Sequence, residues 1–322
     1  METKVTNEKP TFSVVGPVYD EVETLRDFYD RVRAAMEAIG EPWELVLVDD
    51  GSTDGTSEII RDLAFDDIRV RPVLFSRNFG HQIAVTAGLD FSRGQAVVII
   101  DTDLQDPPEL ISELAEKWRA GYEVVYAVRT EREGESWFKR ATASAFYRVI
   151  NRITEVEIPP DAGDFRLLDR KVVNALKTMR EHHRFPRAMT AWVGFRQIGI
   201  PYKRAARRAG ETKYPFRKML RLAINAITGF SYFPLQLATY FGFLSAALAI
   251  VAIPIVVYLR LSGKAELSGQ ATTLIAVLFL GGVQLISLGI LGEYIGRLYD
   301  EAKNRPLYIL REEPAELAEE DR

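Results

Sequence analysis

Two long stretches without a charged side chain limit the folds that are open to this chain of 322 residues. Residues 222–259 and 267–292 contain no Asp, Glu, Lys or Arg. A helix needs about 20 apolar residues to cross a hydrocarbon layer of about 30 Å, and each stretch reaches that length. Buried core helices are the alternative, but such helices usually carry charge on one flank. We therefore expect transmembrane helices at about residues 235–259 and 268–292.

The short segment between these stretches predicts a helical hairpin with both ends on one side of the membrane. Basic side chains flank the hairpin: Lys213, Arg217, Lys218 and Arg221 precede it, and Arg297, Lys303 and Arg305 follow it. Because basic residues accumulate on the cytoplasmic side, we expect a multi-pass protein of the cell (inner) membrane with both termini, and the large domain that precedes the hairpin, in the cytoplasm. Arg260 and Lys264 in the connecting loop weaken this bias slightly.

Composition excludes several kinds of partner and site. With 41 basic and 45 acidic residues the formal charge is −4, so no general attraction to nucleic acid is expected. The chain has no cysteine and only three histidines, which excludes disulfides, zinc-thiolate sites and most histidine metal sites. A bound metal would therefore have oxygen ligands. The polar N-terminus METKVTNEKP lacks an apolar signal segment, so export of the first domain is not expected.

Upstream of the hairpin, strand-like runs alternate with helical patterns. The runs rich in branched residues are TFSVVGPVY, WELVLVDD, RVRPVLFS, AVVIIDTD and YEVVYAVR, and ETLRDFYDRVRAAMEAIG has a helical period. This alternation indicates an α/β fold with a mainly parallel sheet. In such sheets ligands bind beyond the carboxyl ends of the strands, where the loops begin.

Two acidic loops begin at such strand ends. Asp101, Asp103 and Asp106 follow one buried strand. Mg²⁺ or Mn²⁺ accepts carboxylate oxygens and leaves positions for phosphate, so Asp101 and Asp103 predict a metal bridge to a nucleotide diphosphate. The second loop, VDDGSTDGT, has the spacing of a calcium loop from Asp50, but its twelfth position is Arg61 instead of Glu. A plain Asp-Gly turn is the remaining alternative.

Amphipathic and basic segments indicate the lipid side. SWFKRATASAFYRVINRI predicts a helix at about residues 136–153 on the membrane surface, with a globular surface helix as the alternative. A second such helix, FRKMLRLAINAITGF, leads into the first span. Five basic residues are expected to receive the lipid phosphate and the nucleotide diphosphate, although a basic membrane flank would need some of them too: Arg129, Arg132, Lys139, Arg207 and Lys213.

A set of motifs spread over nearly the whole chain carries a family resemblance. The motifs are PVYDE, VDDGSTDGT, RNFGHQIAVTAGLD, IDTDLQDPPE, DAGDFRLLDR, AGETKYPFRKM and GEYIGRLYDEAKNRPLYI. They closely resemble the family 2 glycosyltransferases that charge polyprenyl phosphates, above all the bacterial bactoprenol (undecaprenyl-phosphate) glucosyltransferases and, more distantly, the dolichol-phosphate mannose synthases. Asp20 replaces a usual Asn of that family, and Thr102 replaces a commoner Ala.

The resemblance implies a GT-A nucleotide-sugar fold in residues 1–212, a juxtamembrane helix in 213–234, the hairpin in 235–292 and a cytoplasmic tail in 293–322. It implies that Mg²⁺ or Mn²⁺ binds Asp101 and Asp103. Donor-binding roles are implied for Pro17, Tyr19, Glu21, Asp49, Asp50, Asp101 and Gln105. The implied partners are a UDP-sugar, a polyprenyl phosphate, the lipid bilayer and further copies of the chain in a homo-oligomer such as a tetramer, with no nucleic acid.

The implied reaction is inverting transfer of a sugar, glucose first among the candidates, from UDP-glucose to a polyprenyl phosphate for modification of cell-envelope glycans. Asp103 would act through the metal, and Asp161 or Asp164 matches the region where relatives place a catalytic Asp. We favour Asp164 because it abuts the FRLL strand, with Arg166 on the strand that follows. A phosphate monoester with a second pKa of about 6 is already ionised at pH 7, so this Asp would orient the acceptor as much as abstract a proton.

Other functions remain to be weighed against this one. Mannose, galactose, an N-acetylated sugar or an aminoarabinose derivative are alternative donors, and a catalytically inactive membrane scaffold is the main alternative that is not an enzyme. A processive polysaccharide synthase would need a QxxRW motif, and a P-loop nucleotidase would need GxxxxGK[ST]; the sequence has neither.

Overall fold

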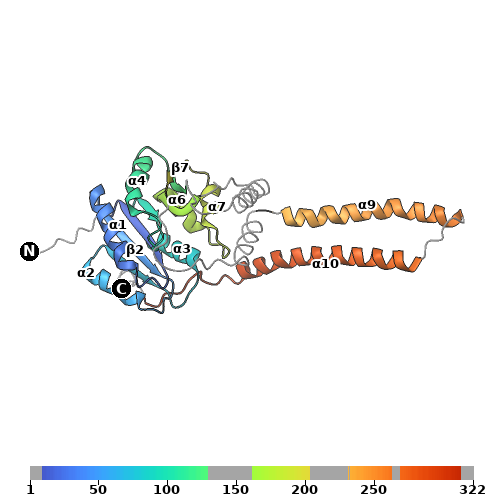
Figure 1. Ribbon diagram of the computed structural model, residues 1–322, viewed down its shortest axis with the longest axis horizontal. Helices are drawn as coiled ribbons and strands as arrows, with labels where there is room; N and C mark the ends of the chain where they lie inside the picture. The colour runs from blue at the N-terminus through green and yellow to red at the C-terminus, as the bar shows by residue number, and fades with distance from the viewer. Residues whose placement is uncertain (1–8, 130–161, 204–230, 232, 263–268, 313–322) are drawn as a thin grey trace, which may run out of the picture. The chain divides into compact units, whose positions relative to one another are not determined.

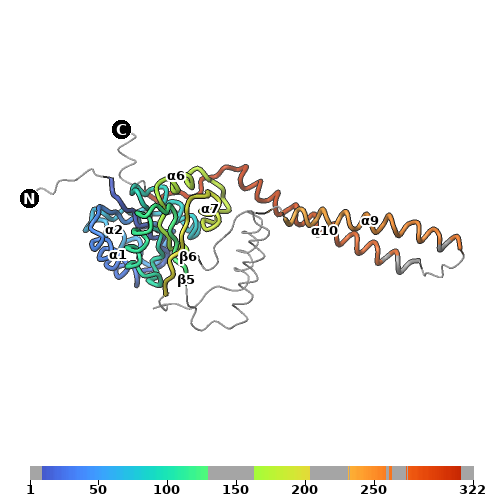
Figure 2. Tube along the Cα trace, turned by 90° about the horizontal axis from the view of Figure 1, so that it is seen from above, coloured from blue at the N-terminus to red at the C-terminus, as the bar shows by residue number. Residues whose placement is uncertain are grey.

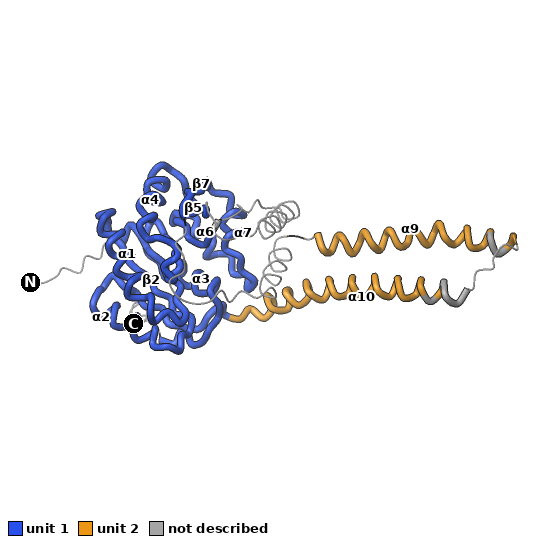
Figure 3. Tube along the Cα trace, in the orientation of Figure 1, with its two compact units in different colours: residues 1–151, 156–215, 306–322 blue, residues 152–155, 216–305 orange. Residues whose placement is uncertain are grey.

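A computed structural model describes residues 9–129, 162–203, 231, 233–262 and 269–312. The chain divides into two compact units, which Figure 3 shows in two colours. Unit 1 comprises residues 1–151, 156–215 and 306–322, and unit 2 comprises residues 152–155 and 216–305. The residues from 306 onward therefore belong with the N-terminal unit and not with the helices that precede them.

The described strands of unit 1 form one mixed sheet in the order β3-β2-β1-β4-β6-β5-β7 (Figure 1). They are β1 Phe12–Val18, β2 Trp43–Asp49, β3 Val70–Leu74, β4 Ala96–Ile99, β5 Val124–Arg129, β6 Ala162–Asp169 and β7 Gln197–Tyr202. Only β6 runs antiparallel to its neighbours, β4 and β5, among these strands. The expectation of a mainly parallel α/β sheet is confirmed, and β1 to β5 are the five strands expected from the sequence.

Helices cover both faces of this sheet. The described ones are α1 Leu25–Ile39, α2 Thr56–Asp66, α3 His81–Phe91, α4 Ile111–Arg119, α6 Arg170–Thr178 and α7 Pro186–Trp192, with a 3₁₀ turn, η1, at Pro108–Leu110. On one face Val14 of β1 belongs to a fully buried cluster with Phe28 of α1 and Ile111 of α4. On the other face α3 packs directly on β1, because a Cβ at Gly88 would lie 2.1 Å from a methyl group of Val15.

The reversed direction of β6 determines where the site forms. Ile99 at the end of β4 pairs with Arg166 of β6 in antiparallel register. Asp101 lies two residues after Ile99 and Asp164 lies two residues before Arg166, so the antiparallel register brings these two carboxylates level at the same end of the sheet. Asp164 lies within β6, together with Arg166, which corrects the expectation of a separate strand after it.

Unit 2 contains two long apolar helices, α9 Phe233–Leu261 and α10 Gly269–Ala302, which run side by side in Figures 1 and 2. Their segments Phe233–Tyr258 and Ile275–Ala302 are long and apolar enough to cross a membrane, and none of their side chains is buried within the structure. α10 continues past residue 292, the expected end. Arg297 supports this extension because it forms an ion pair with Glu293 one turn earlier, at 3.0 Å.

Candidate active site

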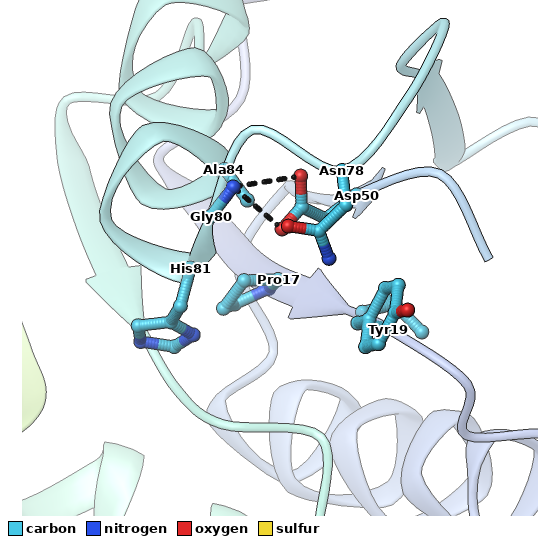
Figure 4. Close-up of a pocket in the computed structure, with 8 residues that line it drawn as sticks. Pro17, Tyr19, Asp50, Asn78, Gly80, His81 and Ala84 are labelled. Atoms are coloured by element: carbon cyan, nitrogen blue, oxygen red, sulfur yellow. Dashed lines mark hydrogen bonds between the residues drawn. The ribbon is translucent and has the colours of Figure 1, made fainter. Parts of the chain in front are cut away.

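A pocket opens where the loops after β1 and β2 meet the start of α3. It is lined by Pro17, Val18, Tyr19, Asp50, Asn78, Gly80, His81 and Ala84. Figure 4 shows His81 and Tyr19 on opposite sides of Pro17, with Asp50 above Pro17 in this view. Three of the residues expected to bind the donor, Pro17, Tyr19 and Asp50, therefore line one pocket.

The loop of residues 49–57 is held together by its own carboxylates. Asp49 is fully buried, and it accepts hydrogen bonds from the N–H of Ser52 at 2.9 Å and from the hydroxyl of Ser57. Asp54 accepts from the N–H of Thr56 at 3.0 Å. Within the described residues no group of three or more His, Cys, Asp or Glu side chains has an arrangement that would hold a metal. The calcium-like spacing therefore forms a self-bonded turn.

Asp50 joins this loop to the segment before α3. Its carboxylate accepts the N–H of Phe79 at 2.6 Å and the N–H of Gly80 at 2.9 Å, and Figure 4 shows the second contact. Burial raises the pKa of Asp50, and the two backbone N–H groups oppose that shift. Gly51 has a φ of +74°, and a Cβ there would lie 2.5 Å from the carbonyl carbon of Arg77. The two loops therefore touch backbone to backbone.

The segment after β1 presents one exposed ring and several bonded groups. Tyr19 is 46% exposed at the pocket, and the negative charge of Asp20 raises its pKa. Asp20 itself has a φ of 51° and accepts a hydrogen bond from the N–H of Thr53 at 2.9 Å. The carboxylate of Glu21 accepts from the hydroxyl of Thr24 at 2.5 Å. Asp20 and Glu21 thus fix the loop, while Tyr19 is the group left exposed to a ligand.

Asp101 and Asp164 meet on either side of His81. The Nε2 atom of His81 lies 3.6 Å from Oδ1 of Asp101 and 3.7 Å from Oδ2 of Asp164. Burial raises the pKa of Asp101 to about 6; His81 opposes the rise and Asp164 adds to it. Burial lowers the pKa of His81, but the two carboxylates outweigh this effect and raise it to about 9. Because the imidazole is 42% exposed, water screens part of that attraction, but the charged form remains favoured.

Two arginines support Asp164. Arg187 of α7 donates from Nε to Oδ1 of Asp164 at 2.8 Å. Arg166 is buried, and it donates to the hydroxyl of Thr190 at 2.6 Å and to the carbonyl of Gly163 at 2.8 Å. Burial would raise the pKa of Asp164, but the charge of Arg187 and hydrogen bonds from His81 and Arg187 hold it well below its ordinary value. Asp164 is therefore ionised at neutral pH.

The remaining residues of the 101–106 loop differ in role. Asp103 accepts the N–H of Gln105 at 3.0 Å, which turns the chain beside Leu104 with its φ of 59°. Asp106 is fully buried and accepts a hydrogen bond from the hydroxyl of Tyr202, whose pKa burial raises to about 12. The third carboxylate of the loop therefore anchors it to β7.

Sequence reasoning missed two charged residues that the fold brings to this corner, His81 and Arg187. The spacing of the histidines tests only for a metal site, whereas Gly80 directly before His81 is the signal that places His81 at a helix start. Arg129, at the end of β5, donates to the hydroxyl of Tyr202 at 3.4 Å. The helix expected at about residues 136–153 lies outside the described residues. So do the other expected site residues, which are Asp161, Arg132, Lys139, Arg207 and Lys213.

Comparison with known proteins adds an independent finding. Residues 13–177 match Glycosyl transferase family 2, and residues 233–298 match the family described as GtrB C-terminal hairpin. A Bacillus subtilis (strain 168) protein named uncharacterized glycosyltransferase YkcC is 50% identical over 93% of this chain and 93% of its own. The SfII prophage-derived bactoprenol glucosyl transferase of Shigella flexneri is 43% identical over 93% of this chain and 97% of its own.

A third relative is similar over the same length. The prophage bactoprenol glucosyl transferase homolog of Escherichia coli (strain K12) is 42% identical over 93% of this chain and 98% of its own. The matched region of the first family runs from β1 into α6 and so includes His81, Asp101 and Asp164. With this coverage and the mixed GT-A-like sheet, the chain belongs to glycosyl transferase family 2 and is a glycosyltransferase with a GtrB-type C-terminal hairpin.

Proposed function

We propose that this chain transfers glucose from UDP-glucose to a polyprenyl phosphate at the cytoplasmic face of the membrane. The observation that carries the proposal is the meeting of Asp101 and Asp164 around His81, within 3.6 and 3.7 Å of its Nε2, beside the pocket of Tyr19 and Asp50. The relatives named bactoprenol glucosyl transferase support glucose as the sugar and a polyprenyl phosphate as the acceptor.

The donor nucleotide would enter the pocket of Pro17, Tyr19 and Asp50. The exposed ring of Tyr19 offers a face for the base and a hydroxyl for a hydrogen bond. Glu21, Asp49 and Asp50 have carboxylates bonded within the protein, so they act on the nucleotide mainly by fixing the loops that surround it. Gln105, beside Asp103, would contact the sugar or the metal shell.

Asp101 and Asp103 would hold Mg²⁺ or Mn²⁺ against the diphosphate. The residues fit such an ion, because Oδ1 of Asp101 is buried and has no hydrogen-bond partner within the described structure. Two carboxylates are fewer ligands than either ion takes, which leaves positions for diphosphate oxygens. When bound, the ion neutralises the charge that develops on the leaving diphosphate.

Asp164 would orient the acceptor phosphate. The phosphate oxygen forms the new bond to the anomeric carbon, the bond from that carbon to UDP breaks, and UDP leaves with the electron pair. Direct attack inverts the configuration, so an α-linked donor gives a β-linked product. Because the acceptor is already ionised at pH 7, the carboxylate of Asp164, held by Arg187, serves chiefly for position.

The lipid side of the proposal depends on the hairpin and on basic residues. α9 and α10 would cross the membrane, and Arg129 with Arg132, Lys139, Arg207 and Lys213 would meet the two phosphate groups. We also propose that several copies assemble in the membrane, as a tetramer or another homo-oligomer. Cysteines placed in this cysteine-free chain test the orientation: Leu267→Cys should be labelled from outside, and Thr3→Cys and Glu320→Cys only after the membrane is opened.

A donor screen tests the function directly. Purified full-length protein is mixed with undecaprenyl phosphate, Mg²⁺ or Mn²⁺, and one UDP-sugar at a time, and the lipid products are separated by mass. We expect a hexose adduct from UDP-glucose and UDP as the second product. An adduct from only another sugar nucleotide would change the substrate. No adduct with any donor, in protein that folds normally, would support the scaffold alternative.

A further inference from the structure

The segment after α10 returns to unit 1 as a strap, which we define as residues 306–312. Backbone contacts fasten it to the end of β3: an antiparallel bridge between Phe75 and Leu310, a hydrogen bond from Ser76 N–H to the carbonyl of Ile309 at 2.9 Å, and one from Arg311 N–H to the carbonyl of Leu74 at 2.7 Å. β3 is the last strand in the order of the sheet, so the strap pairs with an edge strand just before that strand leads into the pocket.

Tyr308 of the strap contacts both elements that flank the pocket loop of residues 76–80. Its ring stacks on Phe75 with the centroids 5.1 Å apart and the planes 12° from parallel. Its hydroxyl donates to Oδ2 of Asp90 at 3.0 Å, near the end of α3. Asp90 is held in turn by Arg180 at 2.7 Å. One side chain therefore joins the end of β3 to the last turn of the helix that begins at the pocket.

A line of contacts runs from Tyr308 into the pocket. Phe75 is fully buried, and its ring packs edge-to-face against Phe79, with the centroids 5.6 Å apart. The N–H of Phe79 and that of Gly80 donate to Asp50, a pocket residue. Each step is a packed ring or a hydrogen bond at normal distance, so a movement of Phe75 has to move the loop that carries those two N–H groups.

We propose that Tyr308 is a positioning residue for the donor pocket. By clamping Phe75 and Asp90, it holds the 76–80 loop in the conformation in which Asn78, Gly80 and His81 line the pocket. A loop fixed before the ligand arrives does not lose its conformational freedom on binding, so the clamp increases affinity without contacting the ligand. The kinetic part of this inference rests on the proposed use of a UDP-sugar.

Full-length protein in detergent, with the variants Tyr308→Ala and Tyr308→Phe, provides the test. The Phe variant keeps the stacking and loses only the hydrogen bond to Asp90. Ile309→Ala is the matched control, because that side chain is 55% exposed while its backbone carbonyl is retained. Binding of UDP with Mg²⁺, KM and kcat with UDP-glucose, thermal unfolding, and hydrogen exchange of the Phe79 and Gly80 amides are measured.

We expect Tyr308→Ala to raise the Kd of UDP and the KM about tenfold, with kcat within about twofold, because a stacked pair and a hydrogen bond are lost at a distance from the chemistry. Tyr308→Phe should change them about twofold to threefold, and Ile309→Ala should match the wild type. The Phe79 and Gly80 amides, which bond to Asp50 and not to the strap, should exchange faster in Tyr308→Ala.

Lower thermal stability of Tyr308→Ala with unchanged KM and unchanged exchange at Phe79 and Gly80 would overturn the inference, because the strap would then only protect the sheet edge. If wild-type protein fails to bind UDP, the proposed donor is wrong, and the exchange measurement alone decides the role of the strap. Should Tyr308→Ala not fold, Arg311→Pro, which removes the donor to Leu74, replaces it, with Arg311→Ala as its control. Equal exchange in those two variants would also overturn the inference.

Discussion

The two acidic loops that follow β2 and β4 have similar composition but differ in the bonding of one carboxylate, that of Asp101. In the loop of residues 49–57, Asp49, Asp50 and Asp54 each accept at least one backbone N–H. In the loop of residues 101–106, Oδ1 of Asp101 is buried without a hydrogen-bond partner in the described structure and faces other ionisable groups. The first loop bonds its carboxylates within the fold, whereas the second leaves an oxygen of Asp101 for the ligand that we propose.

Carboxylates at the end of a strand therefore do not by themselves identify a ligand-binding site. A buried carboxylate is stable when the protein donates hydrogen bonds to it and costly when the protein does not. The 49–57 loop therefore contributes stability and shape, and Asp101 is held against an energetic cost.

The largest effect is expected at Asp101 and Asp103, which we propose hold the metal. Asp101→Asn and Asp103→Ala should each lower the transfer rate by about 1,000-fold or more, because charge on the leaving diphosphate is no longer neutralised. Asp101→Asn should unfold at the same temperature as the wild type or a higher one, since a poorly bonded buried charge is removed. Rates and thermal unfolding are compared with the wild type, with and without chelator. Full activity in the double variant or in chelator would refute the metal assignment.

The next largest effect is expected at the DAGDF carboxylates. Asp164→Asn should lose about 100- to 1,000-fold in kcat, and Asp161→Asn should lose much less, because Asp164 lies level with Asp101. Raising the pH should restore little of the Asp164→Asn rate, since the acceptor is already ionised and position has been lost. A full recovery at high pH would show that proton abstraction is the main task of Asp164. Wild-type rates for both variants would remove this segment from the mechanism.

His81 gives a third and smaller effect. It is the cation between Asp101 and Asp164, so its loss leaves two negative groups facing each other at the site. We expect His81→Gln to lower kcat about 10- to 100-fold while thermal stability changes little, because the side chain is 42% exposed. Steady-state kinetics and thermal unfolding measure the two effects. His81→Gln with a normal rate would show that the two carboxylates do not need a cation between them.

Only some of the contacts around Asp101 and Asp164 could be predicted from the sequence. The strands β1 to β5 and α1 were predictable because runs of buried branched residues and a helical period mark them. The place of Asp101 and Asp103 at a strand end was predictable from the buried run before them, and their pairing around a metal stays a prediction. Only the FRLL part of β6 was predictable as a strand, because the charged residues in AGDFRLLD hide the pattern that would place Asp164 inside it.

The partners of the pair depended on long-range register. Nothing local in the sequence states that β6 inserts antiparallel between β4 and β5, which is what brings Asp164 level with Asp101. Arg187 reaches Asp164 from α7, and Tyr308 reaches Phe75 from a segment more than 200 positions later in the chain. Contacts of this kind follow from tertiary packing, for which a single sequence provides no pattern.

In the self-bonded loop the expected effect is on stability more than on rate. Asp49→Ala removes both acceptor oxygens, so the Ser52 N–H and the Ser57 hydroxyl lose their partner. We expect the free energy of unfolding to fall by about 1–3 kcal/mol and kcat to fall less than tenfold at a temperature where the protein is folded. Chemical unfolding measures the free energy, and kcat is measured at about 20 °C below the Tm of the variant. A rate loss as large as that of Asp101→Asn, in folded protein, would end the contrast between the two loops.

The smallest expected effect is at Thr102, which lies in the 101–106 loop but is hydrogen-bonded within the protein, like the carboxylates of the 49–57 loop. Its hydroxyl is buried and donates to the carbonyl of Pro17 at 3.1 Å, so it joins the ends of β4 and β1 beneath the pocket. Thr102→Ala should lower the free energy of unfolding by about 1 kcal/mol and leave kcat and the metal requirement within about twofold of the wild type, because the carbonyl of Pro17 loses one neutral hydrogen bond and no charge changes. Thr102→Ser, which keeps the hydroxyl, is the control and should recover most of that stability. A tenfold loss of rate in Thr102→Ala with normal stability would mean that the hydrogen bond to Pro17 positions Asp101 and Asp103. The contrast would then lie between residues of the 101–106 loop and not between the two loops.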